Sequence, residues 1–148
     1  MSSEHITRCD FERSKLVLRL DLTFQADIHS ITPVVDRVMN VAGEMSCARG
    51  KEFEVEVSLR EALVNAVKHG CGNDPNHSVQ LTVCCDESRG MLIIVRDPGP
   101  GFDPDSLPSP LIGENVFASH GRGIFLINQL MDEVRVLARG TEIHMVKR

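Results

Sequence analysis

Hydrophobic and polar residues alternate along the first part of the chain with two different periods. Between Leu16 and Leu22 apolar residues occupy every second position, which predicts a half-buried strand. From about residue 27 to 48 they recur every three or four positions, which predicts an amphipathic helix. The apolar positions of this helix are Ile28, Ile31, Val34, Val35, Val38, Val41 and Met45. Pro33 is tolerated near the helix start, and Gly50 is expected to close the helix.

A second helical pattern covers about 51–70 and is followed by strands. Its apolar stripe consists of Val55, Leu59, Ala62, Leu63, Ala66 and Val67. A cluster of turn-forming residues ends it: Gly70, Gly72, Asn73, Asp74 and Pro75. Residues 78–85 and 91–96 are expected to form a hairpin across the polar turn 86–90.

The last third of the chain begins with a segment rich in Gly, Pro, Asp and Ser, residues 97–120. A long segment of this kind inside a compact domain is typical of a functional lid, which we place at 102–120. After it, 123–131 is expected to be helical, and 134–138 and 141–146 to form a closing hairpin.

The order of these elements predicts the fold class. It runs strand, helix, helix, strand, strand, lid, helix, strand, strand, so helices and strands do not alternate one for one as in a doubly wound parallel sheet. We therefore expect an α/β protein of the α+β type: a two-layer sandwich with a mixed, mostly antiparallel sheet covered by helices on one face. Residues 15–148 form one domain in this interpretation, and 1–14 form a polar N-terminal tail.

Composition narrows the class of protein. The chain has 148 residues, 42% hydrophobic and 25% charged, as is normal for a globular domain. It has no apolar run long enough to span a membrane and no signal peptide, so we expect a cytoplasmic protein without membrane association. A net charge of −5 argues against nucleic acid as a direct partner.

The five cysteines are expected to be reduced thiols, as is usual in the cytoplasm. Cys71, His77, Cys84 and Cys85 lie close together in the sequence, but they contain no C-x-x-C pair. We therefore expect small buried side chains here rather than a zinc site.

The second helix carries polar residues beside its apolar stripe. Helical spacing groups Glu61, Asn65, Lys68 and His69 within about one quadrant of its surface. Asn65 is a suitable magnesium ligand, Glu61 a general base and Lys68 a phosphate contact. Taken alone, the same residues are also compatible with a solvated helix face.

Asp97 follows an apolar strand, at the point where the chain leaves the sheet. Gly99 and Gly101 after it would let the backbone approach a flat ligand, and the carboxylate could accept from the amine of adenine. An ordinary turn with a solvated aspartate is the alternative.

Gly121, Arg122 and Gly123 precede the last helix, whose N-terminus could hold phosphate. A simple entry into a helix is the alternative. Thr141 could support the base edge opposite Asp97, although a β-branched residue on a strand is equally common. Neither the phosphate-loop motif nor the dinucleotide-binding motif is present.

Together these motifs resemble the four boxes of the GHKL ATPases, the Bergerat fold. EALVNAVKHG, DPGPGFD and GRGIFLINQLMDEV are most similar to those of bacterial anti-sigma factor serine-protein kinases, and the resemblance covers about 15–148. It implies that the chain binds ATP or ADP with Mg²⁺. Glu61 would be the base and Asn65 the metal ligand. The other nucleotide contacts would be Lys68, His69, Asp97, Gly99, Gly101, Gly121, Arg122, Gly123 and Thr141.

The resemblance also implies partners and a reaction. The γ-phosphate of ATP would pass to a serine or threonine of an anti-anti-sigma (STAS-type) antagonist, and the chain would sequester a sigma factor or another regulator, as a homodimer. The lid carries three prolines and little positive charge, so the alternative is a nucleotide-dependent switch that binds partners without phosphotransfer. A sensor histidine kinase is not expected, because no separate phospho-accepting helix pair is present.

Overall fold

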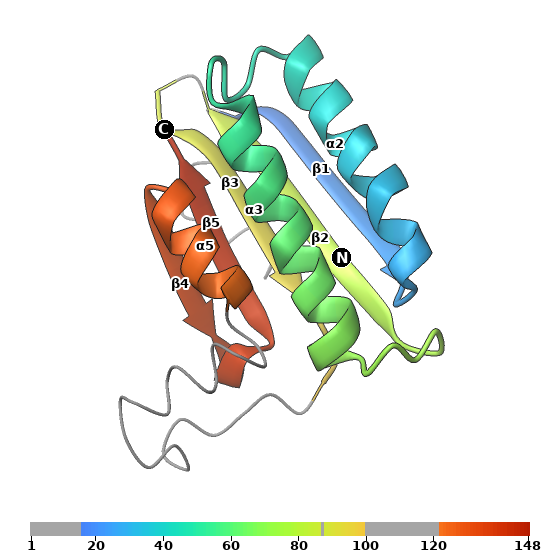
Figure 1. Ribbon diagram of the computed structural model, residues 1–148. Coiled ribbons are helices and arrows are strands. Elements are labelled where there is room, and N and C mark those ends of the chain that lie inside the picture. Colours follow the sequence, from blue (N-terminus) through green and yellow to red (C-terminus); the bar gives the residue numbers. More distant parts are fainter. Residues whose placement is uncertain (1–15, 87, 100–121) are drawn as a thin grey trace, which may run out of the picture.

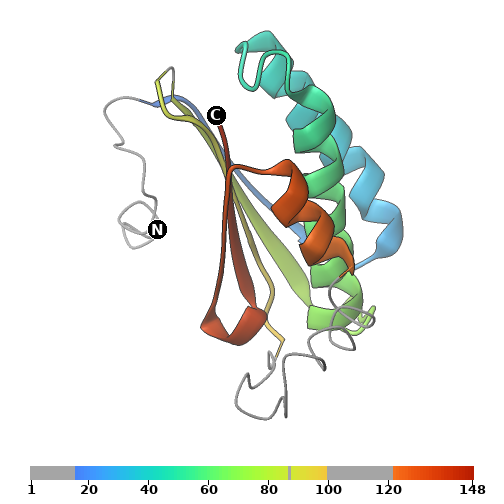
Figure 2. The same ribbon diagram turned by 60° about the vertical axis from the view of Figure 1, so that its left-hand side comes forward.

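The described residues form two layers, a five-stranded sheet and a set of helices packed on one of its faces (Figures 1 and 2). The computed structural model describes residues 16–86, 88–99 and 122–148. The expected N-terminal tail and the whole of the expected lid, 102–120, therefore lie outside the described residues.

The strands pair in the order β1-β2-β3-β5-β4, and every pair is antiparallel. Their bounds are β1 Leu16–Gln25, β2 Ser78–Asp86, β3 Gly90–Arg96, β4 Glu133–Leu137 and β5 Glu142–Lys147. Strand β3 lies in the middle, so its last residue adjoins both the β2 and the β5 sides of the sheet.

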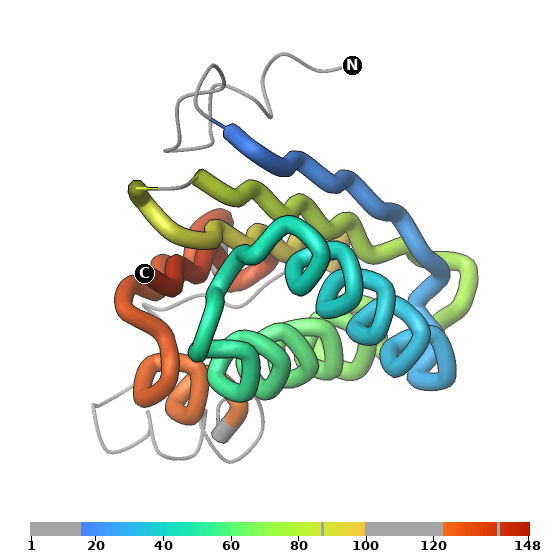
Figure 3. Tube along the Cα trace, turned by 90° about the horizontal axis from the view of Figure 1, so that it is seen from above, coloured from blue at the N-terminus to red at the C-terminus, as the bar shows by residue number. Residues whose placement is uncertain are grey.

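Among the described residues, three α-helices cover one face of the sheet: α2 Ile31–Glu44, α3 Glu52–Asn65 and α5 Arg122–Leu130. Viewed from above, α3 lies between α2 and α5 (Figure 3). A short 3-10 turn, η2 Ile28–Ser30, precedes α2, and another, η6 Ala138–Gly140, joins β4 to β5. At the N-terminus of η2 the Asp27 carboxylate accepts a hydrogen bond from the His29 amide at 2.9 Å.

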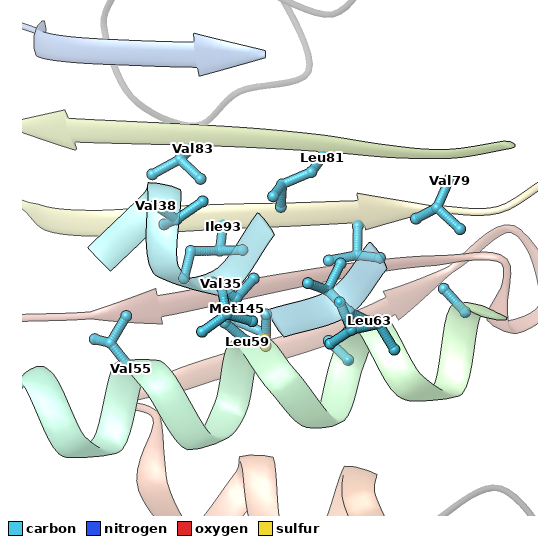
Figure 4. Packing of buried hydrophobic residues seen from close by; sticks show 14 of the residues in the cluster. Val35, Val38, Val55, Leu59, Leu63, Val79, Leu81, Val83, Ile93 and Met145 are labelled. Atoms are coloured by element: carbon cyan, nitrogen blue, oxygen red, sulfur yellow. The ribbon is translucent and has the colours of Figure 1, made fainter. Parts of the chain in front are cut away.

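The main core lies between the helices and the sheet. Leu59 and Leu63 of α3 are fully buried against Ile93 and Met145 of the central strands (Figure 4). All six residues of the apolar stripe predicted for this helix are buried. Burial of leucine-sized side chains contributes about 2 kcal/mol each, so the position of α3 is strongly determined.

The opposite face of the sheet carries a second, smaller apolar cluster of Cys84, Leu92, Ile94 and Val146. Buried polar residues share this face, because side chains alternate between the two faces along each strand. They include Thr82, Glu142 and His144.

The predicted fold class is confirmed, and the strand boundaries agree closely with the expectation. Gly50 does not close the first helix as predicted, because α2 already ends at Glu44. Two further differences concern the helices. Ile28 and Met45 are 40% and 43% exposed, because α2 is shorter than the pattern suggested and both residues lie outside it. The second helix does not remain α-helical to Gly70: residues Ala66–Gly70 (η3) are π-helical, and the Cys71 amide bonds the Ala66 carbonyl at 2.9 Å.

The expectation that all cysteines are thiols is wrong for two of them. Cys47, between α2 and α3, forms a disulfide with Cys85 of β2, with 6.2 Å between their Cα atoms. They are 38 positions apart in the sequence and meet only because α2 and α3 pack on the sheet. Cys71 and Cys84 carry thiols. No group of three or more metal-ligating side chains occurs among the described residues, and no helix in these ranges is long and apolar enough to cross a bilayer.

Reduction of the disulfide is expected to destabilise the fold. A bridge that closes a loop of this length stabilises by about 4 kcal/mol, so dithiothreitol should lower the melting temperature by roughly 10 °C. Cys85→Ser should abolish this response, whereas Cys84→Ser, on the opposite face of the same strand, should keep it. Calorimetry with and without reductant measures the difference, and an equal response in both variants would refute the assignment.

Candidate functional site

Four of the predicted site residues, Asn65, His69, Asp97 and Thr141, lie together between the C-terminal end of α3 and the ends of β3 and β5. A pocket opens there, and the helix, the sheet, α5 and η6 all contribute to its wall. Its lining residues are Ala62, Asn65, Ala66, His69, Gly70, Val95, Asp97, Ile124, Val136, Gly140, Thr141 and Ile143. The wall combines apolar side chains with a few polar groups, as ligand pockets commonly do.

Asp97 lies at the end of β3 and is held from two sides. Its amide donates to the Thr141 carbonyl at 2.9 Å. One oxygen of its carboxylate accepts from the Gly99 amide at 2.8 Å. Burial raises the pKa of the Asp97 carboxyl, and the hydrogen bond from Gly99 partly opposes this rise. A half-buried carboxylate with free acceptor capacity is suited to receive an N–H donor from a ligand.

Gly70 allows the end of the π-helical segment to lie directly against Asp97. A Cβ at position 70 would overlap the Asp97 carboxyl, and a Cβ at Gly99 would overlap the Gly70 carbonyl. The sequence pattern suggested only a helix-breaking role for Gly70, since this contact exists only in the folded chain. Cys71, the next residue, is buried, and burial raises the pKa of its thiol, with Asp97 and Asp74 adding to the effect.

Gly123 brings the last helix onto the polar edge of α3. A Cβ at this position would lie 2.9 Å from both the Asn65 side-chain nitrogen and a Glu61 carboxylate oxygen. The start of α5 therefore touches the acid and the amide, one helical turn apart. This close approach brings the predicted glycine segment before the last helix against the predicted acid and amide of α3.

The other predicted residues are distributed as follows. Thr141 lines the pocket just before β5 begins, and its hydroxyl donates to the Ala138 carbonyl at 2.7 Å. His69 lines the pocket, whereas Lys68 is exposed and is not part of the wall. The proposed phosphate contact of Lys68 therefore stays a prediction. Gly101, Gly121 and the Arg122 side chain lie outside the described residues.

Sequence reasoning missed most of the apolar wall, including Val95, Ile124, Val136 and Ile143. These positions carry ordinary strand and helix residues, and no sequence signal distinguishes them from other core residues. Only the convergence of the elements shows that they share a cavity.

Comparisons with known proteins show the family to which the chain belongs. The family model for the histidine kinase-like ATPase domain matches residues 24–147. An anti-sigma F factor of Oceanobacillus iheyensis is 31% identical over 99 residues, which are 64% of this chain and 67% of that protein. The serine-protein kinase RsbW of Bacillus subtilis is 32% identical over 104 residues, 65% of this chain and 63% of that protein.

A solved structure shows the same fold. The RsbU and RsbW domains of Rv1364c from Mycobacterium tuberculosis superpose with a TM-score of 0.60 at 16% identity, covering 87% of this chain and 31% of that one. At this identity the likeness concerns the fold alone. The family match and the sequence relatives confirm the resemblance drawn from the motifs: the chain belongs to the histidine kinase-like ATPase domains and is related to anti-sigma F factors and serine-protein kinases of this type.

Proposed function

We propose that this chain is an ATP-dependent anti-sigma factor that phosphorylates a serine or threonine of a STAS-type antagonist. The observation that carries the proposal is the contact of Gly123 with Glu61 and Asn65, beside a pocket that ends at Asp97. Asn65 of α3 and Asp97 after β3 both line this cavity, and the start of α5 lies against Asn65 and the neighbouring acid Glu61. The names of the sequence relatives support the choice of reaction and partner.

The roles of the residues follow from their chemistry. Asp97 would accept from the exocyclic amine of adenine, with Thr141 beside it, just before the neighbouring strand β5. Asn65 would be a ligand of Mg²⁺, and its neutral oxygen fits an ion that is held by few protein groups together with phosphates. The ion would neutralise phosphate charge. Glu61 would take the proton of the acceptor hydroxyl as that oxygen bonds to the γ-phosphorus, while the bond to the leaving ADP breaks.

A partner-binding switch without phosphotransfer is the second candidate, since it requires the same pocket. The cytoplasmic location, the homodimer and the binding of a sigma factor or another regulator are further parts of the proposal.

Substitutions on α3 separate binding from transfer. Glu61→Gln should retain ADP binding and slow phosphate transfer from labelled ATP to a STAS protein of the same genome by about 100-fold or more, because the general base is lost. Asn65→Ala should weaken Mg-ADP binding as well. Glu56→Gln, at an exposed position of the same helix, is the matched control. Tight nucleotide binding without any transfer by the wild type would favour the second candidate.

Asp97→Asn should stabilise the free protein while weakening its binding of ADP. Because burial raises the pKa of Asp97 in the folded state, the protonated form stabilises the fold, and this contribution is lost as the pH rises through the raised pKa. The uncharged variant should therefore melt at a higher temperature than the wild type at neutral pH.

The difference in melting temperature should disappear once the pH falls below the unfolded-state pKa of aspartate. Conversely, ADP affinity of the wild type should fall as the pH drops through the raised pKa, because a protonated oxygen no longer accepts the adenine amine. If Asp97→Asn binds ADP as tightly as the wild type does, the Asp97 carboxylate does not recognise the nucleotide.

Gly123→Ala should impair nucleotide binding without destabilising the fold. The added Cβ displaces the flexible ends of Glu61 and Asn65 rather than backbone, and alanine favours the helix by up to about 1 kcal/mol. Gly43→Ala, also in a helix but with no atom within 4 Å of the new Cβ, is the control and should leave binding unchanged. Calorimetric titration with Mg-ADP tests both; equal affinity in the two variants would show that the approach of α5 does not matter for the ligand.

A further inference from the structure

Three polar side chains form a compact buried cluster on the sheet face opposite the helices. Arg96 Nε lies 2.6 Å from one Glu142 oxygen, and His144 Nε2 lies 2.6 Å from the other. The Arg96 and Glu142 side chains are 11% and 7% exposed, and that of His144 is 3% exposed. Since an ionised carboxylate only accepts hydrogen bonds, Nε2 of His144 carries a proton in this arrangement.

The cluster holds its acid in the ionised form. Burial alone would raise the pKa of Glu142, but the hydrogen bonds from His144 and Arg96 and the charge of Arg96 hold that pKa below its ordinary value. The carboxylate thus keeps both of its strong partners through the neutral range.

Stability alone does not explain such a cluster. The neighbouring positions on the same face are filled by Leu92, Ile94 and Val146, and buried ion pairs can often be replaced by apolar residues without loss of stability. Arg96 Nη2 and His144 Nδ1 are buried and have no hydrogen-bond partner within the described ranges, which adds to the free-energy cost of burying the cluster. The free-energy cost of burying these polar groups indicates that the cluster is needed to hold the strands in a defined geometry.

The cluster sits at the last rung of the β3–β5 ladder. Arg96 pairs with Glu142, and one further backbone bond, from the Asp97 amide to the Thr141 carbonyl, follows it. Pro98 has no N–H with which to extend the ladder. The pairing of the two chain segments therefore ends at Asp97 and Thr141, the two residues that line the pocket.

Arg96 and Glu142 each adjoin one of those pocket residues in the sequence. Because side chains alternate along a strand, Arg96 lies on one face and Asp97 on the other, and the pocket is lined by Asp97 and Thr141. A slip or splay at this rung would move both pocket residues.

We propose that the Arg96–Glu142–His144 cluster is a positioning unit for the nucleotide base. It locks the ends of β3 and β5 from behind the sheet, and so fixes Asp97 relative to Thr141 in front of it. The inference rests on the nucleotide site proposed above and assigns no contact between the cluster and the ligand.

The test compares ion pairs at two places on the same sheet face. Arg96→Met and Glu142→Gln should each weaken Mg-ADP binding on the order of tenfold and reduce the preference for ADP over GDP. Arg19→Met is the matched control, because Arg19 pairs with Asp21 at 2.9 Å on the edge strand β1, away from the pocket. It should leave both quantities unchanged.

A double variant separates positioning from simple loss of stability. Arg96→Met combined with Glu142→Gln removes both charges, so its melting temperature should recover relative to Arg96→Met, which leaves a buried carboxylate without its cation. Affinity and base preference should not recover. If affinity recovers with stability, or if the single variants bind ADP as the wild type does, the positioning role is wrong.

The wild type also reports on the parent proposal. If it binds no adenine nucleotide, both proposals fall together. If it binds ADP and the cluster variants bind equally well, only the positioning role is refuted. Should Arg96→Met fail to fold, Arg96→Lys, which keeps the charge without the planar geometry, carries the same test: wild-type affinity and base preference would refute the role.

Discussion

The packing of α3 against the sheet is the constraint on which the rest of the structure depends. Its buried leucines lie over the central strands, while α2 and α5 flank it on either side. A helix held on three sides cannot rotate without exposing core residues. Glu61 and Asn65, which lie beside its apolar stripe, are therefore presented at a fixed edge, and the pocket forms where that edge meets the ends of β3 and β5.

The site also depends on two places where the backbone of a glycine lies directly against a polar side chain. Gly70 lets the helix end touch Asp97, and Gly123 lets α5 touch the acid and the amide. In both places a single methyl group would separate groups that need to meet. The polar residues of the site are thus positioned by the absence of side chains as much as by contacts between side chains.

Charge is distributed between the two faces of the sheet in different ways. In front, Asp97 is half-buried and its pKa is raised, so the free protein is less stable than it would be with a neutral residue there. Behind, Glu142 is buried but paired, and its pKa is lowered. A destabilised carboxylate can gain from a ligand that donates to it, whereas a satisfied one can hold a strand in place. Asp97 and Glu142 lie one residue pair apart along the β3–β5 ladder. This proximity supports the inference that the buried Glu142 ion pairs help to position Asp97.

The sequence alone determined the order and type of the elements, because the spacing of apolar residues within each segment indicates whether it is a strand or a helix and which face is buried. The stripe from Val55 to Val67 is an example, as all of its members are buried. Motif residues such as Asn65 and Asp97 were also identifiable, since their residue types and order along the chain are distinctive.

The tertiary structure decided what depends on residues far apart in the chain. It set the strand order, paired Cys47 with Cys85, turned the end of the second helix into a π segment, and placed Gly70 on Asp97 and Arg96 beside Glu142. None of these has a local pattern, because each arises from a contact between segments that the sequence keeps separate and only packing brings together.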